Sequence, residues 1–327
     1  MITHPQLFVA NARTALKIGF NQIGMKRGEK ILVPDFICDV LLHPILQEGL
    51  IPFYYPVTQD LVPDWHALEL IATSSSCQAL IMVHYFGQPQ NIEQFRLFCS
   101  RHNLLLVEDN AHGYGGSLAG KPLGSFGDIG ISSPRKILGT ASGGILHGAS
   151  TLSSEFVKNM RPFPVYRPIS FLKAVLYSMP RIRRFVKGWS DRNKNWSDPL
   201  LDQESVQSDH GIDRFSRWRI VSADLQAVAA RRRENWLAWA RFARSKGLQT
   251  VFSEVHPESC PWAMPVYTRD LVERNLWLTW GARNGVTLFP WPTLPEDVIP
   301  LDGDALARWQ NLVCFNLDRS PPPGSHL

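Results

Sequence analysis

The stretch QALIMVHYFGQPQNIEQFRLFCSRHNLLLVED, residues 78–109, holds two apolar runs on either side of one amphipathic segment. The runs 78–86 and 103–109 are apolar over most of their length, which is typical of strands buried on both faces of a parallel sheet. Between them, Phe95, Phe98 and Cys99 recur at helical spacing. The stretch therefore predicts a strand, a helix and a second, parallel strand.

The same alternation extends back to the N-terminus. Short apolar runs at 30–34 and 51–57 are rich in β-formers, and residues 12–24, 40–49 and 64–73 read as helices. Strands that alternate with helices of about ten residues indicate a parallel sheet covered on both faces. The fold class that follows is α/β.

The composition changes near residue 150. Residues 151–217 are rich in Pro, Arg and aromatic side chains, a long helix is predicted over 222–247, and the last eighty residues read as a smaller α+β unit. We predict a large domain over 1–217, with a basic, aromatic insertion at about 151–217, and a small domain over 218–327.

The totals exclude several classes of protein. The chain has 327 residues, 44% hydrophobic and 19% charged, which is typical of a soluble globular protein. No run of 18 apolar residues occurs, so no membrane span is expected, and the N-terminus lacks a signal-peptide pattern. The five scattered cysteines predict neither a disulfide framework nor a metal site. A cytoplasmic location is the simplest interpretation.

The net charge of +5 is unevenly distributed. Residues 158–196 hold ten Lys or Arg and one acidic residue, with aromatic side chains between them. This region suits an anionic partner such as a nucleotide diphosphate, a nucleic acid or a membrane surface. Such charge runs are more often solvated faces, which is the interpretation that we favour, and we expect no nucleic-acid partner.

Polar residues follow the predicted strands, where ligands bind in open α/β sheets. His84 follows one run, and Glu108 and Asp109 end the next. Adjacent side chains of a strand point to opposite faces, so only one of the two carboxylates can face a site.

The helix predicted over 12–24 begins with Asn11, a good N-cap, which leaves the amides of Ala12 and Arg13 available to an anion such as phosphate. Further along, Lys136 lies in a run of small residues behind Ser132 and Ser133. Each feature alone is commonly a cap, a turn or a solvated loop. The chain lacks a GxGxxG after its first strand, a P-loop, HExxH and GxSxG.

The order of these motifs is more specific than any one of them. ARTAL is followed by GEKILVPDF, ALIMVHYFGQP, LLLVEDNAHGYGG, GKPLGSFGDIG, a lysine and GG. This order resembles the DegT/StrS-type family of sugar aminotransferases, mainly over residues 8–148. The family binds pyridoxal 5′-phosphate (PLP) and has the aspartate-aminotransferase (type I) fold. The resemblance implies a three-layer, mostly parallel large domain and a smaller C-terminal α+β domain.

The resemblance also implies a role for each matching residue. Lys136 would form the Schiff base with PLP and then shuttle protons, while Asp109 would pair with the protonated ring nitrogen. Ala111 would lie against the ring and His112 near its phenolic oxygen. The phosphate would lie on the amides of Ala12 and Arg13, with Ser132 or Ser133. His84, matched in the family, is a candidate for lining the substrate pocket.

The implied reaction moves an amino group from an amino acid, glutamate or glutamine, to a keto group of a nucleotide-linked sugar. Its product would enter a polysaccharide, a lipopolysaccharide or a glycosylated metabolite. Family dehydratases carry histidine in place of the lysine, so Lys136 favours transamination. The family also implies a homodimer with shared active sites.

Three departures from the family pattern leave alternatives open. The segment ISSPR before Lys136 is short, so both serines remain phosphate candidates; His112 replaces a glutamine; and Cys38 stands about where an aromatic residue stacks on the cofactor. The alternative is a family member that has lost catalysis and acts as a binding or regulatory protein.

Overall fold

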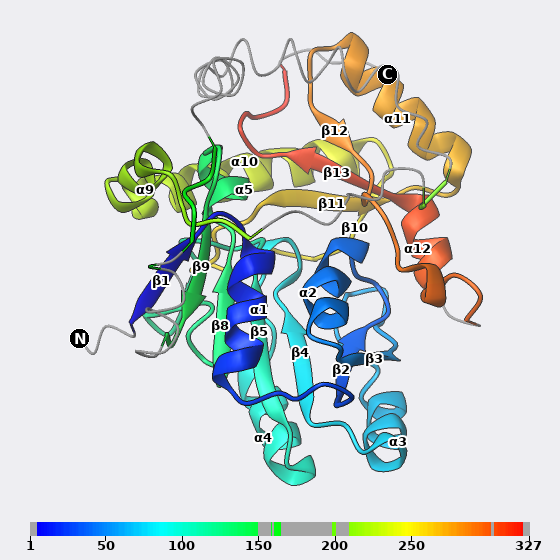
Figure 1. The fold of residues 1–327 in the computed structure, drawn as a ribbon. Helices are drawn as coiled ribbons and strands as arrows, with labels where there is room; N and C mark the ends of the chain where they lie inside the picture. Colours follow the sequence, from blue (N-terminus) through cyan, green and yellow to red (C-terminus); the bar gives the residue numbers. More distant parts are fainter. Residues whose placement is uncertain are drawn as a thin grey trace.

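A computed structural model describes residues 5–149, 158, 160–164, 198–200, 209–301 and 304–322. Its main feature is a seven-stranded sheet with the strand order β1-β9-β8-β5-β4-β2-β3 (Figure 1). The strands are β1 (Gln6–Val9), β2 (Lys30–Pro34), β3 (Ile51–Tyr55), β4 (Ala79–Val83), β5 (Leu105–Asn110), β8 (Ile129–Ser132) and β9 (Gly144–His147). Strands β2, β3, β4, β5 and β8 are parallel, and β9 is antiparallel to both β8 and β1. The mostly parallel sheet predicted from the alternating pattern is confirmed.

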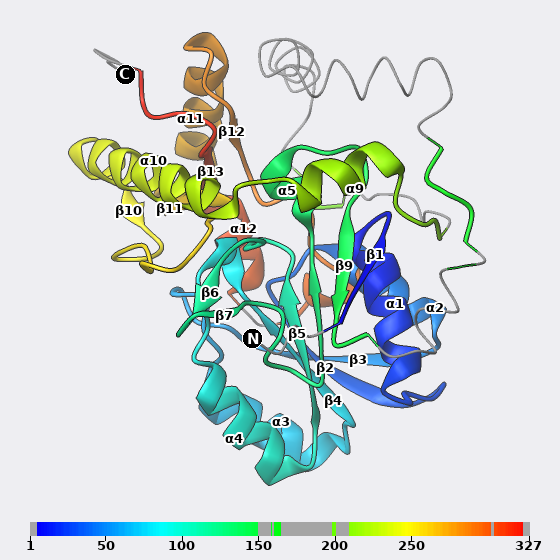
Figure 2. The ribbon, with the colours of Figure 1, turned by 90° about the vertical axis from the view of Figure 1, so that its left-hand side faces the viewer.

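Four helices cover this sheet: α1 (Ala12–Gln22), α2 (Leu42–Gln47), α3 (Trp65–Ser75) and α4 (Ile92–His102). Figure 2 shows α1 and α2 on one side of the sheet and α3 and α4 on the other. Side chains of Asn11, Asp64 and Asn91 cap the first turns of α1, α3 and α4. Because helices lie on both faces, all five residues of β4 are buried.

Two predicted elements are shorter than their apolar runs. The strand predicted over 78–86 ends at Val83, because Tyr85–Gly87 form a 3₁₀ turn (η2) in which Phe86 has φ +54°. The helix predicted over 40–49 is divided into a 3₁₀ turn η1 (Asp39–Leu41) and α2. Both turns lie at the carboxyl ends of strands, where the chain leaves the sheet.

The second half of the chain forms a four-stranded antiparallel sheet in the order β10-β11-β13-β12. Its strands are β10 (Gln249–Thr250), β11 (Ala263–Tyr267), β12 (Leu288–Phe289) and β13 (Leu312–Asn316), with helices α10 (Leu225–Ser245), α11 (Leu271–Arg283) and α12 (Ala305–Asn311) and the 3₁₀ turn η3 (Glu296–Val298). This is the smaller α+β unit predicted from the sequence. The predicted boundary between 217 and 218 falls inside α9 (Arg214–Val221), and the domain division stays a prediction.

Short elements lie between the later strands of the large sheet. The hairpin β6 (Ser117–Leu118) and β7 (Lys121–Pro122) follows β5, and the one-turn helix α5 (Pro134–Leu138) lies between β8 and β9. Most of the predicted basic segment 158–196 lies outside the described residues. Within the described part of the chain, no helix is long and apolar enough to cross a membrane.

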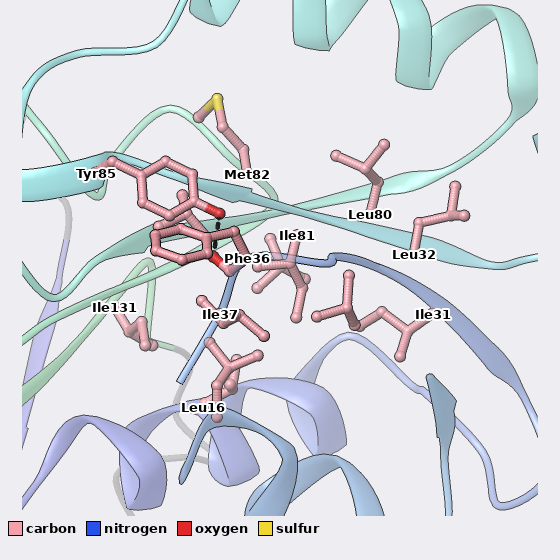
Figure 3. Packing of buried hydrophobic residues seen from close by; sticks show 14 of the residues in the cluster. Leu16, Ile31, Leu32, Phe36, Ile37, Leu80, Ile81, Met82, Tyr85 and Ile131 are labelled. Atoms are coloured by element: carbon pink, nitrogen blue, oxygen red, sulfur yellow. Dashed lines mark hydrogen bonds between the residues drawn. The ribbon is translucent and has the colours of Figure 1, made fainter. Parts of the chain in front are cut away.

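The hydrophobic core is continuous between the two units. Leu16, Ile31, Ile81 and Ile131 pack between α1 and the sheet, and Tyr85 donates a hydrogen bond to the Phe36 carbonyl at 2.6 Å (Figure 3). The same cluster includes side chains of the C-terminal unit, among them Trp291, Leu294 and Trp309. This packing fixes the C-terminal unit over the carboxyl ends of the parallel strands.

Candidate active site

The candidate site begins at the carboxyl ends of β5 and β8, which pair in parallel with Asp109 opposite Ile131 and Asn110 opposite Ser132. Ser133 and α5 follow β8 directly, so Lys136 lies close to the end of β5. Pro134 starts α5 and Gly139 ends it with φ +66°. Figure 1 shows α5 at the top of β8 and β9, and Figure 2 shows it beside α9.

Asp109 is buried and only partly hydrogen bonded. Its Oδ1 accepts a hydrogen bond from the Ala111 amide at 2.7 Å, and its Oδ2 accepts none within the described residues. Burial raises the pKa of the Asp109 carboxyl, against the Ala111 amide and the charge of Lys136, which both lower it. The carboxylate thus has one oxygen available to a cationic partner.

Lys136 is electrostatically coupled to three of the predicted site residues. Its charge lowers the pKa of Asp109, of His112 and of Cys38, although burial is the largest influence on each of them. Its ammonium lies over the indole of Trp262, with Nζ 4.9 Å from the ring centroid. The structure therefore brings Lys136, Asp109, His112 and Cys38 together.

His112 has a defined protonation state. Burial and the charge of Lys136 lower its pKa well below the ordinary histidine value, so the ring is neutral at pH 7. The Phe86 amide donates a hydrogen bond to His112 Nδ1 at 3.3 Å. The proton of the neutral ring therefore lies on Nε2, which is a hydrogen-bond donor.

The N-terminus of α1 lies against the glycines that follow α5. Asn11 caps α1 by accepting a hydrogen bond from the Thr14 amide at 2.9 Å, while Ala12 and Arg13 supply the first amides of the helix. A Cβ at Gly144 would lie 2.6 Å from the Ala12 nitrogen, so only glycine permits this approach. The close approach to α1 thus explains why glycine stands at position 144.

The two candidate serines have different environments. The hydroxyl of Ser132 is fully buried between Asn110 Nδ2 at 3.2 Å and His147 Nε2 at 2.8 Å. Ser133 precedes α5, and its hydroxyl makes no hydrogen bond to the described residues. Ser133 is therefore the better candidate for a ligand, because Ser132 is already bound within the protein.

Cys38 contacts the C-terminal unit. Thr293 Oγ1 lies 2.5 Å from Asp39 Oδ1, to which it donates, and 3.1 Å from Cys38 Sγ. Burial raises the pKa of Cys38 to about 11, so the thiol is protonated at neutral pH. Cys38, predicted to lie against the cofactor, thus also joins the start of η1 to residues 290–295 of the C-terminal unit.

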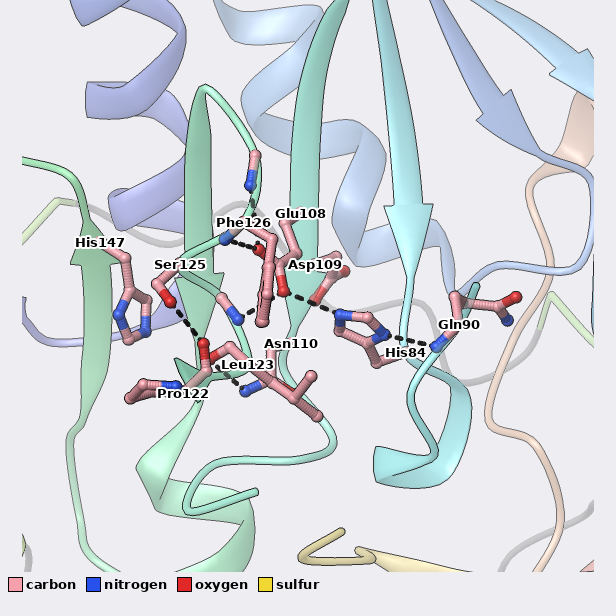
Figure 4. A network of polar contacts seen from close by, with 12 residues as sticks. His84, Gln90, Glu108, Asp109, Asn110, Pro122, Leu123, Ser125, Phe126 and His147 are labelled. Atoms are coloured by element: carbon pink, nitrogen blue, oxygen red, sulfur yellow. Dashed lines mark hydrogen bonds and ion pairs between the residues drawn. The ribbon is translucent and has the colours of Figure 1, made fainter. Parts of the chain in front are cut away.

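His84 belongs to a polar network beside the site (Figure 4). The Gln90 amide donates to its Nδ1 at 3.0 Å, so its Nε2 is the donor to Glu108 Oε1 at 2.8 Å. Glu108 also accepts hydrogen bonds from the amides of Gly124, Phe126 and Gly127. Both side chains are fully buried, so the structure places His84 in this pair.

Comparisons with known proteins identify the family of the chain. The model of the DegT/DnrJ/EryC1/StrS aminotransferase family matches residues 5–167, which include β1 to β9 and all the residues discussed above except the C-terminal ones. The chain belongs to this family.

The relatives of this chain differ in how much of the sequence aligns with it. GDP-perosamine synthase of Vibrio cholerae is 27% identical over 328 residues, 93% of this chain and 86% of that protein. UDP-N-acetyl-3-dehydro-alpha-D-glucosamine 3-aminotransferase of Acidithiobacillus ferrooxidans is 29% identical over 41% of this chain and 37% of its own length. The second alignment spans well under half of either protein.

The structure also resembles solved members of the fold. An E. coli GDP-4-keto-6-deoxy-D-mannose-3-dehydratase with bound hydrated PLP superposes with a TM-score of 0.67 and 16% identity, over 96% of this chain and 83% of that chain. The predicted three-layer large domain with a smaller α+β domain is confirmed by this likeness.

Sequence reasoning missed the contribution of the C-terminal unit to the family site. Trp262 and Thr293 reach the Lys136 region from loops before β11 and after β12. Arg232 of α10 donates to the carbonyl oxygens of Pro261 and Trp262 at 2.6 and 2.7 Å. The sequence offered only weak signs of this contribution. Arg232 lies among the apolar positions of a predicted helix, and Trp262 lies in a segment without periodicity.

Proposed function

We propose that the chain is a PLP-dependent aminotransferase that moves an amino group from an amino acid to a keto group of a nucleotide-linked sugar. The observation that carries the proposal is the placement of Lys136 beside Asp109, a buried carboxylate with one oxygen that accepts no hydrogen bond within the described residues. The names of the relatives support the substrate class, since they include a GDP-perosamine synthase and a UDP-sugar 3-aminotransferase.

The site residues fit PLP in charge and in hydrogen bonding. Asp109 offers a carboxylate oxygen for a protonated ring nitrogen, and the Nε2–H of His112 offers a donor for the phenolic oxygen. The amides of Ala12 and Arg13 and the hydroxyl of Ser133 offer donors for a phosphate. Each polar group of the cofactor thus has a counterpart among these residues.

Asp109 and Lys136 divide the chemistry between them. When bound, PLP supplies an electron sink that stabilises the charge left at a carbon after its proton departs. Asp109 would offer its carboxylate oxygen to the protonated ring nitrogen and hold the proton there. Lys136 Nζ accepts a proton from the α-carbon of the amino donor and later delivers a proton to the carbon that bore the keto group.

The remaining residues position these two. Ala111 would lie against the ring, and Cys38, through Thr293, would hold residues 290–295 against the same side of the site. We propose that His84 acts through Glu108, by positioning the turn 124–127, rather than by contact with the substrate. Glutamate or glutamine is the proposed amino donor.

Spectroscopy of the purified protein tests the proposal. Protein incubated with PLP should be yellow, and borohydride should remove the colour and leave a pyridoxyl group on the peptide that contains Lys136. A colourless protein that ignores PLP would contradict the proposal. Protein that binds PLP at Lys136 but aminates no keto sugar with glutamate or glutamine would favour the non-catalytic alternative.

We also propose that the enzyme is a cytoplasmic homodimer with shared active sites. Support for the dimer comes from α9, where Phe215, Trp218 and Val221 are exposed at intervals of three residues. Support for a reducing compartment comes from the cysteines, all five of which are free thiols. Light scattering gives the mass in solution, and a monomer at micromolar concentration would contradict the first part.

A further inference from the structure

Trp262 lies at the reacting end of the site without a role in the function proposed above. Lys136 Nζ lies 4.9 Å from the centroid of its indole. The same indole stacks on His112, with centroids 4.5 Å apart and planes 26° apart. Trp262 is only partly buried, unlike His112, so part of its surface is accessible at this place.

The indole is held in place from both sides. The Trp262 amide donates to the Phe86 carbonyl at 2.9 Å, and the buried guanidinium of Arg232 donates to the carbonyls of Pro261 and Trp262. Phe289 packs against the ring with centroids 5.0 Å apart. A large, partly accessible aromatic ring whose backbone is fixed by three hydrogen bonds is preorganised to bind a ligand.

The chemistry of the indole face identifies the class of ligand. The face carries a negative quadrupole, which attracts cations and the partly positive C–H groups of an apolar ring face. A pyranose presents such a face of axial C–H groups. The keto carbon of a sugar must come within reach of Lys136 Nζ, so the sugar ring that bears it lies beside Trp262.

We propose that the indole of Trp262 is the surface on which the pyranose ring of the sugar substrate stacks. This rests on the function proposed above and adds a specificity-determining residue to it. The amino donor, which has no pyranose ring, gains nothing from the indole. Trp262 therefore discriminates between the two substrates of one site.

The two half-reactions can be measured separately because the amino donor and the sugar react in turn. We would follow the cofactor absorbance in single turnovers, first with glutamate alone and then, on the aminated enzyme, with a nucleotide keto sugar. Trp262→Leu should raise the sugar concentration for half-maximal rate about tenfold. Trp262→Phe, which keeps a ring, should change it less, and in both variants any loss in the glutamate half-reaction should be much smaller than the loss in the sugar half-reaction.

The matched control is Trp277→Phe, which changes a tryptophan of the second core cluster, whose residues do not include Trp262 or Lys136. It should leave both half-reactions unchanged. Equal losses in both halves for Trp262→Leu, or a changed cofactor spectrum, would show that Trp262 supports the cofactor and would overturn the proposal, as would no loss in either half. A wild-type protein without a glutamate half-reaction would instead contradict the proposed function.

Discussion

Glu108 and Asp109 are neighbours on β5, yet they have opposite environments. Glu108 accepts four hydrogen bonds, from His84 and from three backbone amides, whereas Asp109 accepts one. Burial alone would raise the pKa of Glu108, but the hydrogen bond from His84 and those from the amides of Gly124 and Phe126 outweigh it and lower the pKa. For Asp109, burial prevails and the pKa is raised.

The difference teaches how one strand serves structure and chemistry at once. A buried carboxylate with all its oxygens bound stabilises the fold, because its desolvation is compensated by donors. A buried carboxylate with an oxygen left over weakens the fold and retains affinity for a cationic ligand. Since alternate residues of a strand face opposite sides, the two roles occupy consecutive positions without interfering.

The largest expected effect on turnover comes from Lys136, which lies on the face of the sheet toward which Asp109 points. Lys136→Arg keeps the positive charge near Asp109 but removes the nucleophilic amine, because a guanidinium does not give up its proton. Turnover should fall by about 10³-fold or more. The check is the steady-state rate of sugar amination, with borohydride labelling of the peptide as a second readout.

A thermal midpoint equal to that of the wild type serves as the control for Lys136→Arg. Turnover within tenfold of the wild type would show that another group moves the proton. Labelling of a different lysine would exclude Lys136 as the site of attachment.

The next effect is on Asp109 itself. Asp109→Asn keeps the shape and the Ala111 contact but removes the charge, and we expect turnover to fall about 100-fold or more. Stability without cofactor should be unchanged or higher, because a buried and poorly paired charge is lost. Rate and urea unfolding are measured on the same preparation, and a large loss of stability would mean that Asp109 is structural.

Glu108→Gln should mainly lower stability, whereas Asp109→Asn should mainly lower turnover. Glutamine has one acceptor oxygen where Glu108 has two, and two donors lie at each oxygen of Glu108, so either orientation of the amide leaves donors unpaired in the core. The free energy of unfolding should fall by about 2–4 kcal/mol. Urea unfolding with the cofactor absent measures it.

The residual turnover of folded Glu108→Gln protein separates the two carboxylates. It should exceed that of Asp109→Asn, since Glu108 does not face Lys136. If Asp109→Asn is the less stable protein and Glu108→Gln the less active one, the assignment of the two faces is reversed.

The contrast between these carboxylates shows what sequence can and cannot predict. The parallel sheet, the N-cap at Asn11 and the position of Asp109 at a strand end follow from local patterns that physical rules connect to structure, whereas the role of Lys136 was implied only by the resemblance to the family. The pairing of His84 with Glu108 could not be predicted in this way, because it joins two strands through their side chains.

Contacts between distant segments account for the other gaps. Trp262, Arg232 and Thr293 lie 96 to 157 positions after Lys136 in the chain and reach it only through the packing of the C-terminal unit. Strands β8 and β9 were also missing from the alternating pattern, because each has four residues and the short α5 lies between them. Short elements carry too few residues for a period to be recognised.

The dependence of stability on pH should separate Glu108 from Asp109 by sign. The lowered pKa of Glu108 gives stability that is present above its unfolded value of 4.5 and lost as the pH falls through the folded value. The raised pKa of Asp109 gives stability that is present below its unfolded value of 3.8 and lost as the pH rises through the folded value. Unfolding by urea from pH 3.5 to 8 should show Glu108→Gln approaching the wild type in acid.

Asp109→Asn should show the reverse, with its advantage over the wild type growing as the pH rises. Asp35 provides an internal reference, because burial raises its pKa to about 6, against the charge of Arg308, and its own loss of stability develops between about pH 4 and 6. Asp35→Asn should therefore flatten the wild-type profile in that window. Parallel profiles for Glu108→Gln and Asp109→Asn would contradict the opposite environments of the two carboxylates.

The smallest expected effect on turnover comes from Cys38, which lies in the same site as Asp109 but carries no charge. With its pKa raised to about 11 by burial, the thiol is neutral at pH 7, and its polar contacts are those with Thr293 Oγ1 and Asp39 Oδ1. Cys38→Ala should therefore cost about 1 kcal/mol of stability and change turnover by less than about threefold. Urea unfolding and steady-state rates measure both, and Cys77→Ala, a buried thiol near Ser75, is the matched control. A loss of turnover near that of Asp109→Asn, with no change in the Cys77 control, would give the Cys38 thiol a direct part in the chemistry.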